Sequence, residues 1–250
     1  MKCLFCGDLH TKHHIFDRVK QLGADYDKVI FLGDYCDDWD TVPDASYNLL
    51  KSLIDYKIAN PDKVILLLGN HDLSEWQSGV FRCSGFNPLT SNLITPLMHD
   101  NWQHFQIACL IDGWLCSHAG FTASWVDKYL PNCDTVEKII NKLQYSYEHR
   151  NDDDESERIF YGLSGVGSAR GGWDFPSPIW TDANELIEDF LPDVKQIIGH
   201  TPMPTISIVN EYGRQFCFCD THSLFSNRKP FGDNTLLELI DGEPHTKPLD

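Results

Sequence analysis

The stretch VIFLGDYCDDWD, from Val29 to Asp40, decides the fold and points to the chemistry. It begins as an unbroken apolar run, which is typical of a strand buried on both faces of a sheet. It ends with four carboxylates within eight residues, namely Asp34, Asp37, Asp38 and Asp40. Like charges at this spacing repel one another, so each needs water, a hydrogen-bond donor or a cation to stay ionised. Taken alone, the stretch fits a solvated acidic loop as well as a cation site.

The same arrangement recurs along the chain. Five apolar runs end within one or two residues of an Asp, Asn or His, in the stretches FCGDLH, FLGDYCDD, LLGNHD, LCSHAG and IIGHTP. In four of the five, glycine precedes the polar residue and permits a sharp exit from the strand. Because ligand sites in open α/β sheets gather at the carboxyl ends of strands, we expect these side chains to converge. They are Asp8, His10, Asp34, Asn70, His71, His118 and His200.

These side chains suit divalent cations. Carboxylate, amide and imidazole groups without cysteine fit Mn²⁺, Fe or Zn²⁺ better than a thiolate cage would. A carboxylate placed between two cations can bridge them, and the metal charge would then offset the repulsion around Asp34. A single histidine at a strand end, such as His118, is more often structural than a ligand. The combination of five such exits in one chain is what indicates a functional site.

The rest of the chain predicts an α/β fold in one domain spanning residues 1–250. Strand-like runs alternate with stretches of helical periodicity, and Asp112-Gly113 between two apolar runs indicates a hairpin. The expected strands include Lys2–Cys6, Val29–Leu32, Val64–Leu68 and several in the last third of the chain. The expected helices are one with Ile15, Phe16, Val19 and Leu22 on one face, one with Leu49, Leu50, Leu53 and Ile54, and three near Thr122–Leu130, Thr135–His149 and Ala183–Phe190.

Composition excludes several classes of protein. The formal net charge is −17, and no Lys/Arg block is present that could follow a phosphate backbone, so nucleic-acid binding by charge is not expected. No apolar stretch approaches the ~20 residues that span a membrane, and no leader-like segment precedes the first strand. Nine cysteines without regular spacing indicate a reduced, cytoplasmic, soluble protein. The Cys3/Cys6 and Cys217/Cys219 pairs are interpreted as buried packing residues.

The series GDLH, GDYCDD, GNHD, SHAG and GHTP resembles the calcineurin-like metallophosphoesterase superfamily, whose motifs are GDxH, GDxxD, GNH(D/E), xHxG and GHT. The resemblance covers roughly Lys2 to Pro202. Within the superfamily the chain is most similar to bacterial and phage phosphoprotein-phosphatase-like enzymes, which share a short Trp-containing segment like SPIWTD at Ser177–Asp182. The resemblance implies a four-layer αββα fold, with two packed mixed sheets flanked by helices.

The resemblance also implies a set of metal ligands. Asp8 and His10 would bind the first of two divalent cations, and Asp34 would bridge both. Manganese is the first candidate, with iron, zinc or cobalt as alternatives. The remaining ligands of the second cation would be Asn70, His118 and His200.

The implied reaction is phosphoester hydrolysis. A hydroxide shared by both cations forms near neutral pH because coordination lowers the pKa of water to around 7, and it attacks phosphorus in line. His71 matches the family's catalytic histidine and would protonate the departing alkoxide, while Asp37 matches the aspartate that orients it. The expected substrate is a phosphomonoester, either a Ser/Thr phosphoprotein or a small phosphoester. A phosphodiesterase, a nucleotide or dinucleoside polyphosphate hydrolase, and a non-catalytic binding module remain alternatives.

The chain departs from the family pattern at the phosphate clamp. Phosphoprotein phosphatases usually have GDxxDRG, but here Asp38 stands in the place of the arginine and Trp39 in that of the glycine. Arg170 in SARGGWD is either the family's other phosphate-binding arginine or a solvent-exposed loop residue. Arg82 is a second candidate clamp, beside an insert at 79–100 that could shape the pocket wall.

Asp38 and Asp40 have no role in the family pattern. They are either solvated loop carboxylates or groups that select a substrate with a cationic or hydroxyl-rich group near the phosphate.

Overall fold

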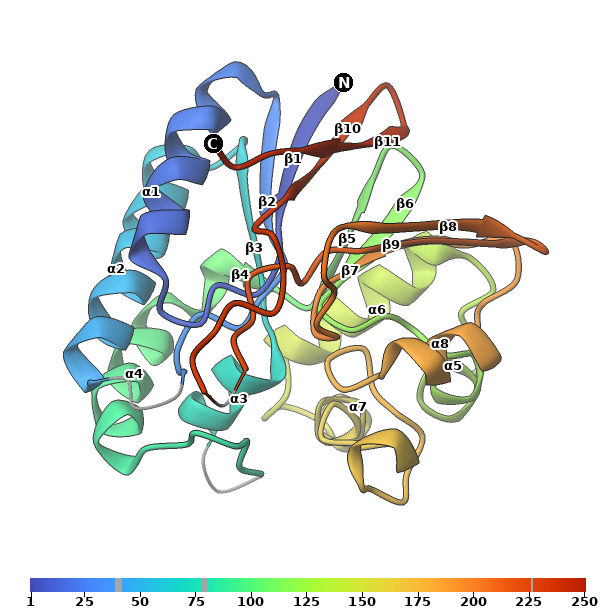
Figure 1. The fold of residues 1–250 in the computed structure, drawn as a ribbon. Coiled ribbons are helices and arrows are strands. Elements are labelled where there is room, and N and C mark those ends of the chain that lie inside the picture. The colour runs from blue at the N-terminus through green and yellow to red at the C-terminus, as the bar shows by residue number, and fades with distance from the viewer. Residues whose placement is uncertain (39–41, 78–80, 226) are drawn as a thin grey trace.

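The computed structural model describes residues 1–38, 42–77, 81–225 and 227–250 (Figure 1). Within these residues two mixed sheets pack face to face, and their strands run in the orders β11-β10-β1-β2-β3-β4 and β5-β6-β7-β9-β8. The first sheet consists of β1 (Lys2–Cys6), β2 (Lys28–Phe31), β3 (Val64–Leu67), β4 (Phe105–Gln106), β10 (Leu236–Ile240) and β11 (Glu243–Lys247). The second consists of β5 (Ala108–Ile111), β6 (Trp114–Ser117), β7 (Lys195–Ile198), β8 (Ser207–Glu211) and β9 (Arg214–Phe218).

Parallel pairing brings the strand ends together. In the first sheet β1, β2 and β3 are parallel, and Phe5, Ile30 and Ile65 lie side by side in register. In the second sheet β6 and β7 are parallel, with Cys116 opposite Ile197. Because parallel strands end at the same edge of a sheet, the motif that follows each strand is delivered to a common place.

An apolar layer fills the space between the sheets. Phe5 and Ile30 from the first sheet pack there with Trp114 and Ile197 from the second. Cys3, Cys217 and Cys219 belong to the same layer, whereas Cys6 faces the helices on the other side of β1. Cys3 and Cys6 therefore point to opposite faces of the strand, as a spacing of three requires. All nine cysteines are without a disulfide.

Helices cover the outer face of each sheet, as the four-layer αββα arrangement requires (Figure 1). On the first sheet lie α1 (His13–Leu22), α2 (Pro43–Ala59) and α4 (Pro88–Asn101), which packs on α2. On the second lie α5 (Ala123–Tyr129), α6 (Val136–Glu148), α7 (Asp154–Gly162) and α8 (Ala183–Glu188). Short 3₁₀ turns are η1 (Gly23–Asp25), η2 (Trp102–His104) and η3 (Ser168–Arg170). The predicted α/β fold class is confirmed.

The predicted hairpin is present. Ile111 pairs with Trp114 across the two-residue turn, whose Asp112 and Gly113 both have positive φ, 47° and 80°. This is the geometry that matches the right-handed twist of the flanking strands.

Three helices of the described residues were not predicted, and the third is α7, which begins in the charged run NDDDESER. The first is α3 (Asn70–Trp76), which begins inside the third motif and is too short for a visible periodicity. The second is α4, which occupies much of the predicted 79–100 insert and contains Pro96 in its interior, where proline argues against a helix. Gly79 and Val80, at the start of that insert, lie outside the described residues. Among the described residues, no helix combines the length and the apolar character needed to cross a bilayer.

Candidate metal centre

The strand-end side chains predicted as ligands lie together, although they come from positions spread over the chain. The backbone amide of His200 donates a hydrogen bond of 2.9 Å to Oδ1 of Asp8, which joins the last motif to the first. A cavity of about 450 Å³ opens at this point. Its walls include Asp8, His10, Asp34, Asn70, His71 and His200. His118 is fully buried and contacts Asn70 and His200 from behind that wall.

Three of the predicted ligands have a left-handed backbone. The φ angles of His10, Asp34 and His200 are 39°, 54° and 62°, a region that non-glycine residues rarely adopt. Such conformations persist where the surrounding structure holds them, and they concentrate at functional sites. Gly33, with φ of 112°, precedes Asp34, and a Cβ there would lie 2.6 Å from the backbone nitrogen of Gly69. The glycine in this motif is therefore required by both conformation and space.

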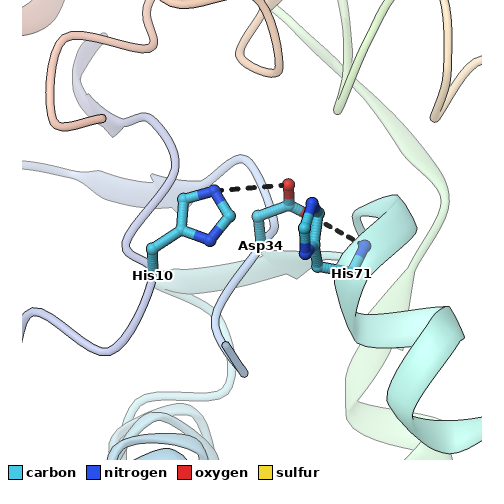
Figure 2. Close-up of side chains that lie close together, drawn as sticks. All are labelled: His10, Asp34 and His71. Carbon is cyan, nitrogen blue, oxygen red and sulfur yellow. Dashed lines mark hydrogen bonds and ion pairs between the residues drawn. The ribbon is translucent and has the colours of Figure 1, made fainter. Parts of the chain in front are cut away.

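Asp34 is shared by two groups of potential ligands. The ligand atoms of His10, Asp34 and His71 lie within 4.8 Å of one another, and so do those of Asp34, His118 and His200. Figure 2 shows the first group, with the two imidazoles on either side of the carboxylate. Oδ2 of Asp34 is 3.7 Å from Nε2 of His10 and 3.3 Å from Nε2 of His118. One carboxylate thus faces both groups, as a bridging ligand must.

The second group fits a cation. His118 donates from Nδ1 to the carbonyl oxygen of Leu32 over 2.9 Å, which leaves a lone pair on Nε2. That atom lies 3.0 Å from Oδ1 of Asn70 and 3.3 Å from Oδ2 of Asp34. The amide nitrogen of Asn70 donates to Sγ of Cys83 over 3.3 Å, so its oxygen is turned toward His118. When Nε2 carries no proton, three acceptor atoms face one another, and a bound cation would satisfy all of them.

The first group is arranged in the same way. His10 donates from Nδ1 to the carbonyl oxygen of Asp37 over 2.6 Å, which leaves the lone pair of Nε2 for a metal. This Nε2 lies 3.9 Å from Oδ2 of Asp8 and 3.7 Å from Oδ2 of Asp34. The most compact group, however, contains His71, which we predicted as the catalytic acid, and not Asp8. His71 is therefore close enough to this site to act on a molecule bound there.

The site has a strongly negative potential. Burial raises the pKa of Asp8 to about 7, and Asp220 adds to this effect. Burial acts in the same direction on Asp34, but His118 and His71 hold its pKa well below the usual range. Burial lowers the pKa of the imidazoles of His10 and His118, yet the carboxylates outweigh it and raise the two values to about 10 and about 9. The potential that retains protons on these imidazoles also attracts divalent cations.

His71 and Asp37 form a close pair. Nδ1 of His71 lies 2.6 Å from Oδ1 of Asp37, and Asp37 is only 3% exposed. The backbone amide of His71 donates to Oδ1 of Asp34 over 3.0 Å. Burial lowers the pKa of His71, but Asp37 and Asp34 more than compensate and raise it to about 9. These charges favour the ionised form of both groups at neutral pH. Asp37 holds the imidazole at Nδ1, and Asp34 holds the backbone of His71.

Two arginines line the cavity. Nε of Arg170 lies 3.2 Å from Oδ2 of Asp182, and its Nη2 donates to Oγ1 of Thr201 over 3.4 Å. Arg170 is exposed, but an ion pair and a hydrogen bond hold it in the cavity wall. Arg82 is exposed as well, and its guanidinium lies 4.9 Å from the ring centre of Phe86. Trp180 of the SPIWTD segment completes this side.

Asp38 is neither solvated nor free. Its Oδ2 lies 2.9 Å from Nζ of Lys12, and both side chains are mostly buried. The residue in the place of the family's arginine is therefore a carboxylate neutralised by a nearby lysine. Trp39 and Asp40 lie outside the described residues.

Asp72 and Asp220 are two of the buried carboxylates that sequence reasoning missed. Asp72 accepts hydrogen bonds from three backbone amides, those of Asp34, Tyr35 and Gly69. It is the last residue of the GNHD stretch, so the motif itself held the signal. Asp220 is fully buried and accepts from the hydroxyl of Ser223. It lies two residues after the end of β9, so this strand exit repeats the predicted pattern, but no glycine precedes the carboxylate.

Two stacked mixed sheets carry carboxylate, amide and imidazole groups at their strand ends, an arrangement that suits a metal-dependent hydrolase. The sequence profile of the calcineurin-like phosphoesterase family matches residues 1–218. The chain belongs to this family, and it is a metallophosphoesterase.

Solved structures agree on the fold. A cold-active protein tyrosine phosphatase of a psychrophilic Shewanella species superposes with a TM-score of 0.56 at 15% identity, covering 98% of this chain and 80% of that one. A protein serine/threonine phosphatase from Saccharomyces cerevisiae superposes with a TM-score of 0.53 at 16% identity, covering 99% of this chain and 80% of that one. At such identities the likeness concerns the fold alone.

Proposed function

We propose that the protein is a dinuclear phosphomonoesterase. The observation that carries the proposal is the position of Asp34, whose carboxylate belongs to both groups of potential ligands. A carboxylate shared in this way is what a pair of cations a few ångströms apart requires. Asp8 and His10 would complete the first site. The second would be completed by Asn70, His118 and His200.

The donor atoms favour particular metals. Oxygen and imidazole nitrogen without thiolate suit Mn²⁺ first, with Fe, Zn²⁺ or Co²⁺ as alternatives. When bound, two such cations supply positive charge at the phosphoryl oxygens and bring the pKa of a water molecule close to neutrality.

The protein's own residues would bind the phosphoryl group and donate the proton to the leaving group. Arg170 faces the cavity from a position held by Asp182 and would bind the phosphoryl group. His71 would donate a proton to the departing oxygen, and Asp37 would keep the imidazole protonated and aimed. The distance of 2.6 Å between Nδ1 of His71 and Oδ1 of Asp37 supports these two roles.

The substrate would be a phosphomonoester such as phosphoserine or phosphothreonine in a protein. Two guanidinium groups, of Arg170 and Arg82, line the cavity and suit the two negative charges of a monoester. The alternative, a phosphodiesterase or a nucleotide or dinucleoside polyphosphate hydrolase, is favoured by one observation. Asp38 occupies the place of the arginine that clamps a monoester in related phosphatases.

A substrate panel separates the two. Steady-state rates would be measured with Mn²⁺ on a phosphothreonine peptide, an aryl phosphate, a bis-aryl phosphodiester and a dinucleoside polyphosphate. We expect kcat/KM for the monoesters to exceed that for the diester by about tenfold or more. A preference for the diester or the polyphosphate would replace the proposal with its alternative.

We further propose one domain and a cytoplasmic location. The layer between the sheets draws on residues from Cys3 to Leu239, which supports a single folding unit. Nine cysteines without a disulfide support a reducing compartment.

A further inference from the structure

A second and smaller hollow continues from the metal cavity past His71. It measures about 110 Å³, and it shares His10, His71, Ser84 and Ser223 with the larger cavity. Beyond those four residues its walls include Asp37 and Asp38. A molecule whose phosphoryl group lies among the metal ligands can therefore extend past His71 into this hollow.

The hollow contains a buried acceptor without a donor. Oδ1 of Asp37 is engaged with His71, but Oδ2 is buried and has no hydrogen-bond partner within the described residues. Buried polar atoms in native proteins are nearly always paired, and leaving an ionised one unpaired is costly. Asp37 is a wall residue of the hollow, although Oδ2 itself is covered, so a bound molecule that reached this oxygen would supply the missing donor.

Apart from the imidazoles of His10 and His71, the other polar groups of the hollow are acceptors as well. The Asp38 carboxylate and the hydroxyl groups of Ser84 and Ser223 can all accept a hydrogen bond. Lys12 offsets the charge of Asp38, with Nζ 2.9 Å from Oδ2. The hollow is thus rich in acceptors but is not an uncompensated cluster of negative charges.

The size of the hollow limits what it can hold. At roughly 30 Å³ for each water-sized atom, there is room for about four atoms. A short aliphatic arm with one polar end fits, whereas a large ring system does not.

We propose that this hollow is the subsite for the leaving group and that it selects phosphomonoesters whose leaving group carries an N–H or O–H donor on a short arm. The inference rests on the proposed function, because it takes His71 as the group next to the departing oxygen. The donor would meet Oδ2 of Asp37 and the Asp38 carboxylate.

Three substrates of equal size test the proposal. O-phosphoethanolamine, 2-hydroxyethyl phosphate and n-propyl phosphate differ only in a terminal ammonium, hydroxyl or methyl group. We expect kcat/KM for both donor-bearing substrates to exceed that for propyl phosphate by about tenfold, the size of one hydrogen bond to a charged group. Equal values for the three substrates would overturn the proposal and leave the proposed function intact.

Variants show whether the substrate preference comes from the hollow or from the overall negative charge of the protein. Asp38→Asn should reduce the preference for the ammonium substrate over propyl phosphate several-fold. Lys12→Met should increase that preference, because it removes the positive charge beside Asp38. The control is Asp100→Asn, which makes the same chemical change at an exposed position in α4 and should keep the ratio. A preference that is equally strong in Asp38→Asn would overturn the proposal.

A variant that does not fold would be replaced by Ser84→Ala, which removes one hydroxyl from the same wall. Thermal melting and metal content of each variant identify such cases. Ser84→Ala should reduce the preference for both donor-bearing substrates, and an unchanged preference would count against the subsite.

Binding can be measured without turnover. Calorimetry of the metal-loaded protein with 3-aminopropylphosphonate, 3-hydroxypropylphosphonate and butylphosphonate uses isosteres that are not hydrolysed. We expect the first two to bind about tenfold more tightly than butylphosphonate. Failure of every phosphomonoester as a substrate would refute the proposed function. Equal binding of the three phosphonates would refute the subsite.

Discussion

Oδ2 of Asp72 accepts a hydrogen bond of 2.8 Å from the backbone amide of Asp34. Asp72, the last residue of the GNHD stretch, thereby holds the turn that carries Asp34, whose side chain faces both ligand groups. The same oxygen accepts from Gly69, and Oδ1 accepts from Tyr35. Burial, with the charge of Asp34 adding to it, raises the pKa of Asp72 to about 6, while the backbone donors act against the rise. The position of Asp34 therefore depends on a carboxylate that itself contacts no substrate.

Asp72→Ala should lower both stability and metal content. It leaves three buried amides without an acceptor, and each such loss costs about 1–3 kcal/mol, so we expect the free energy of unfolding to fall by about 3 kcal/mol or more. Urea denaturation and elemental analysis measure the two effects. Asp100→Ala, at an exposed position, is the matched control. An unchanged urea midpoint with full metal content would remove Asp72 from this role.

Asp34→Asn should lose metal and activity together. Asparagine keeps the size of the side chain and can still accept from the amide of His71, but it lacks the charge that two cations share. Metal ions per chain and kcat would be measured on the same preparation. Retention of two ions per chain would show that Asp34 is not the bridge.

His71→Asn should keep the metals and lose rate. Removing a general acid costs about 10²–10⁴-fold for a leaving group that needs a proton, and much less for an aryl oxide that leaves without one. Rates on an alkyl phosphate and on p-nitrophenyl phosphate give the comparison. A near-normal kcat on the alkyl ester would exclude His71 as the proton donor.

The rate on alkyl esters should fall as pH rises through about 9. Burial lowers the pKa of His71, but Asp37 and Asp34 outweigh it and place the value at about 9, so the imidazole carries its proton below that pH and loses it above. Asp37→Asn removes the largest contribution that raises the pKa, and the falling limb should move to lower pH. Profiles of kcat between about pH 6 and 10 measure this. If the falling limbs of the two pH profiles coincide, Asp37 does not control the protonation of His71.

Arg170→Ala should weaken binding of the phosphoryl group in the transition state. Loss of a charged donor at such a position typically costs about 10²–10³-fold in rate, and metal content should not change. Arg82→Ala should have a smaller effect, because its guanidinium lies over the ring of Phe86, whereas a carboxylate holds that of Arg170. Asp182→Asn releases Nε of Arg170, and its effect on the rate should lie between the effects of Arg170→Ala and Arg82→Ala. If the kinetics of Arg170→Ala equal those of the unaltered protein, Arg170 does not bind the phosphoryl group.

The strand ends could be predicted because each motif is contiguous in sequence. The glycine of the second motif, Gly33, and the carboxylate after it are neighbours, and the apolar run before them marks the strand. The pair of Lys12 and Asp38 could not be predicted in this way, because 26 positions separate them and only the folded loops bring them together. Asp220 was missed for a similar reason, since its nearness to Asp8 depends on how β9 pairs with β7. The helix α4 was missed because the proline inside it contradicts the local pattern.

The left-handed backbone at His10, Asp34 and His200 has an evolutionary consequence. Glycine would relieve the strain at each of these positions and delete a ligand at the same time. Selection for thermostability without an activity screen would therefore not protect these three side chains. A library of this chain should be sorted on turnover first and on heat resistance second.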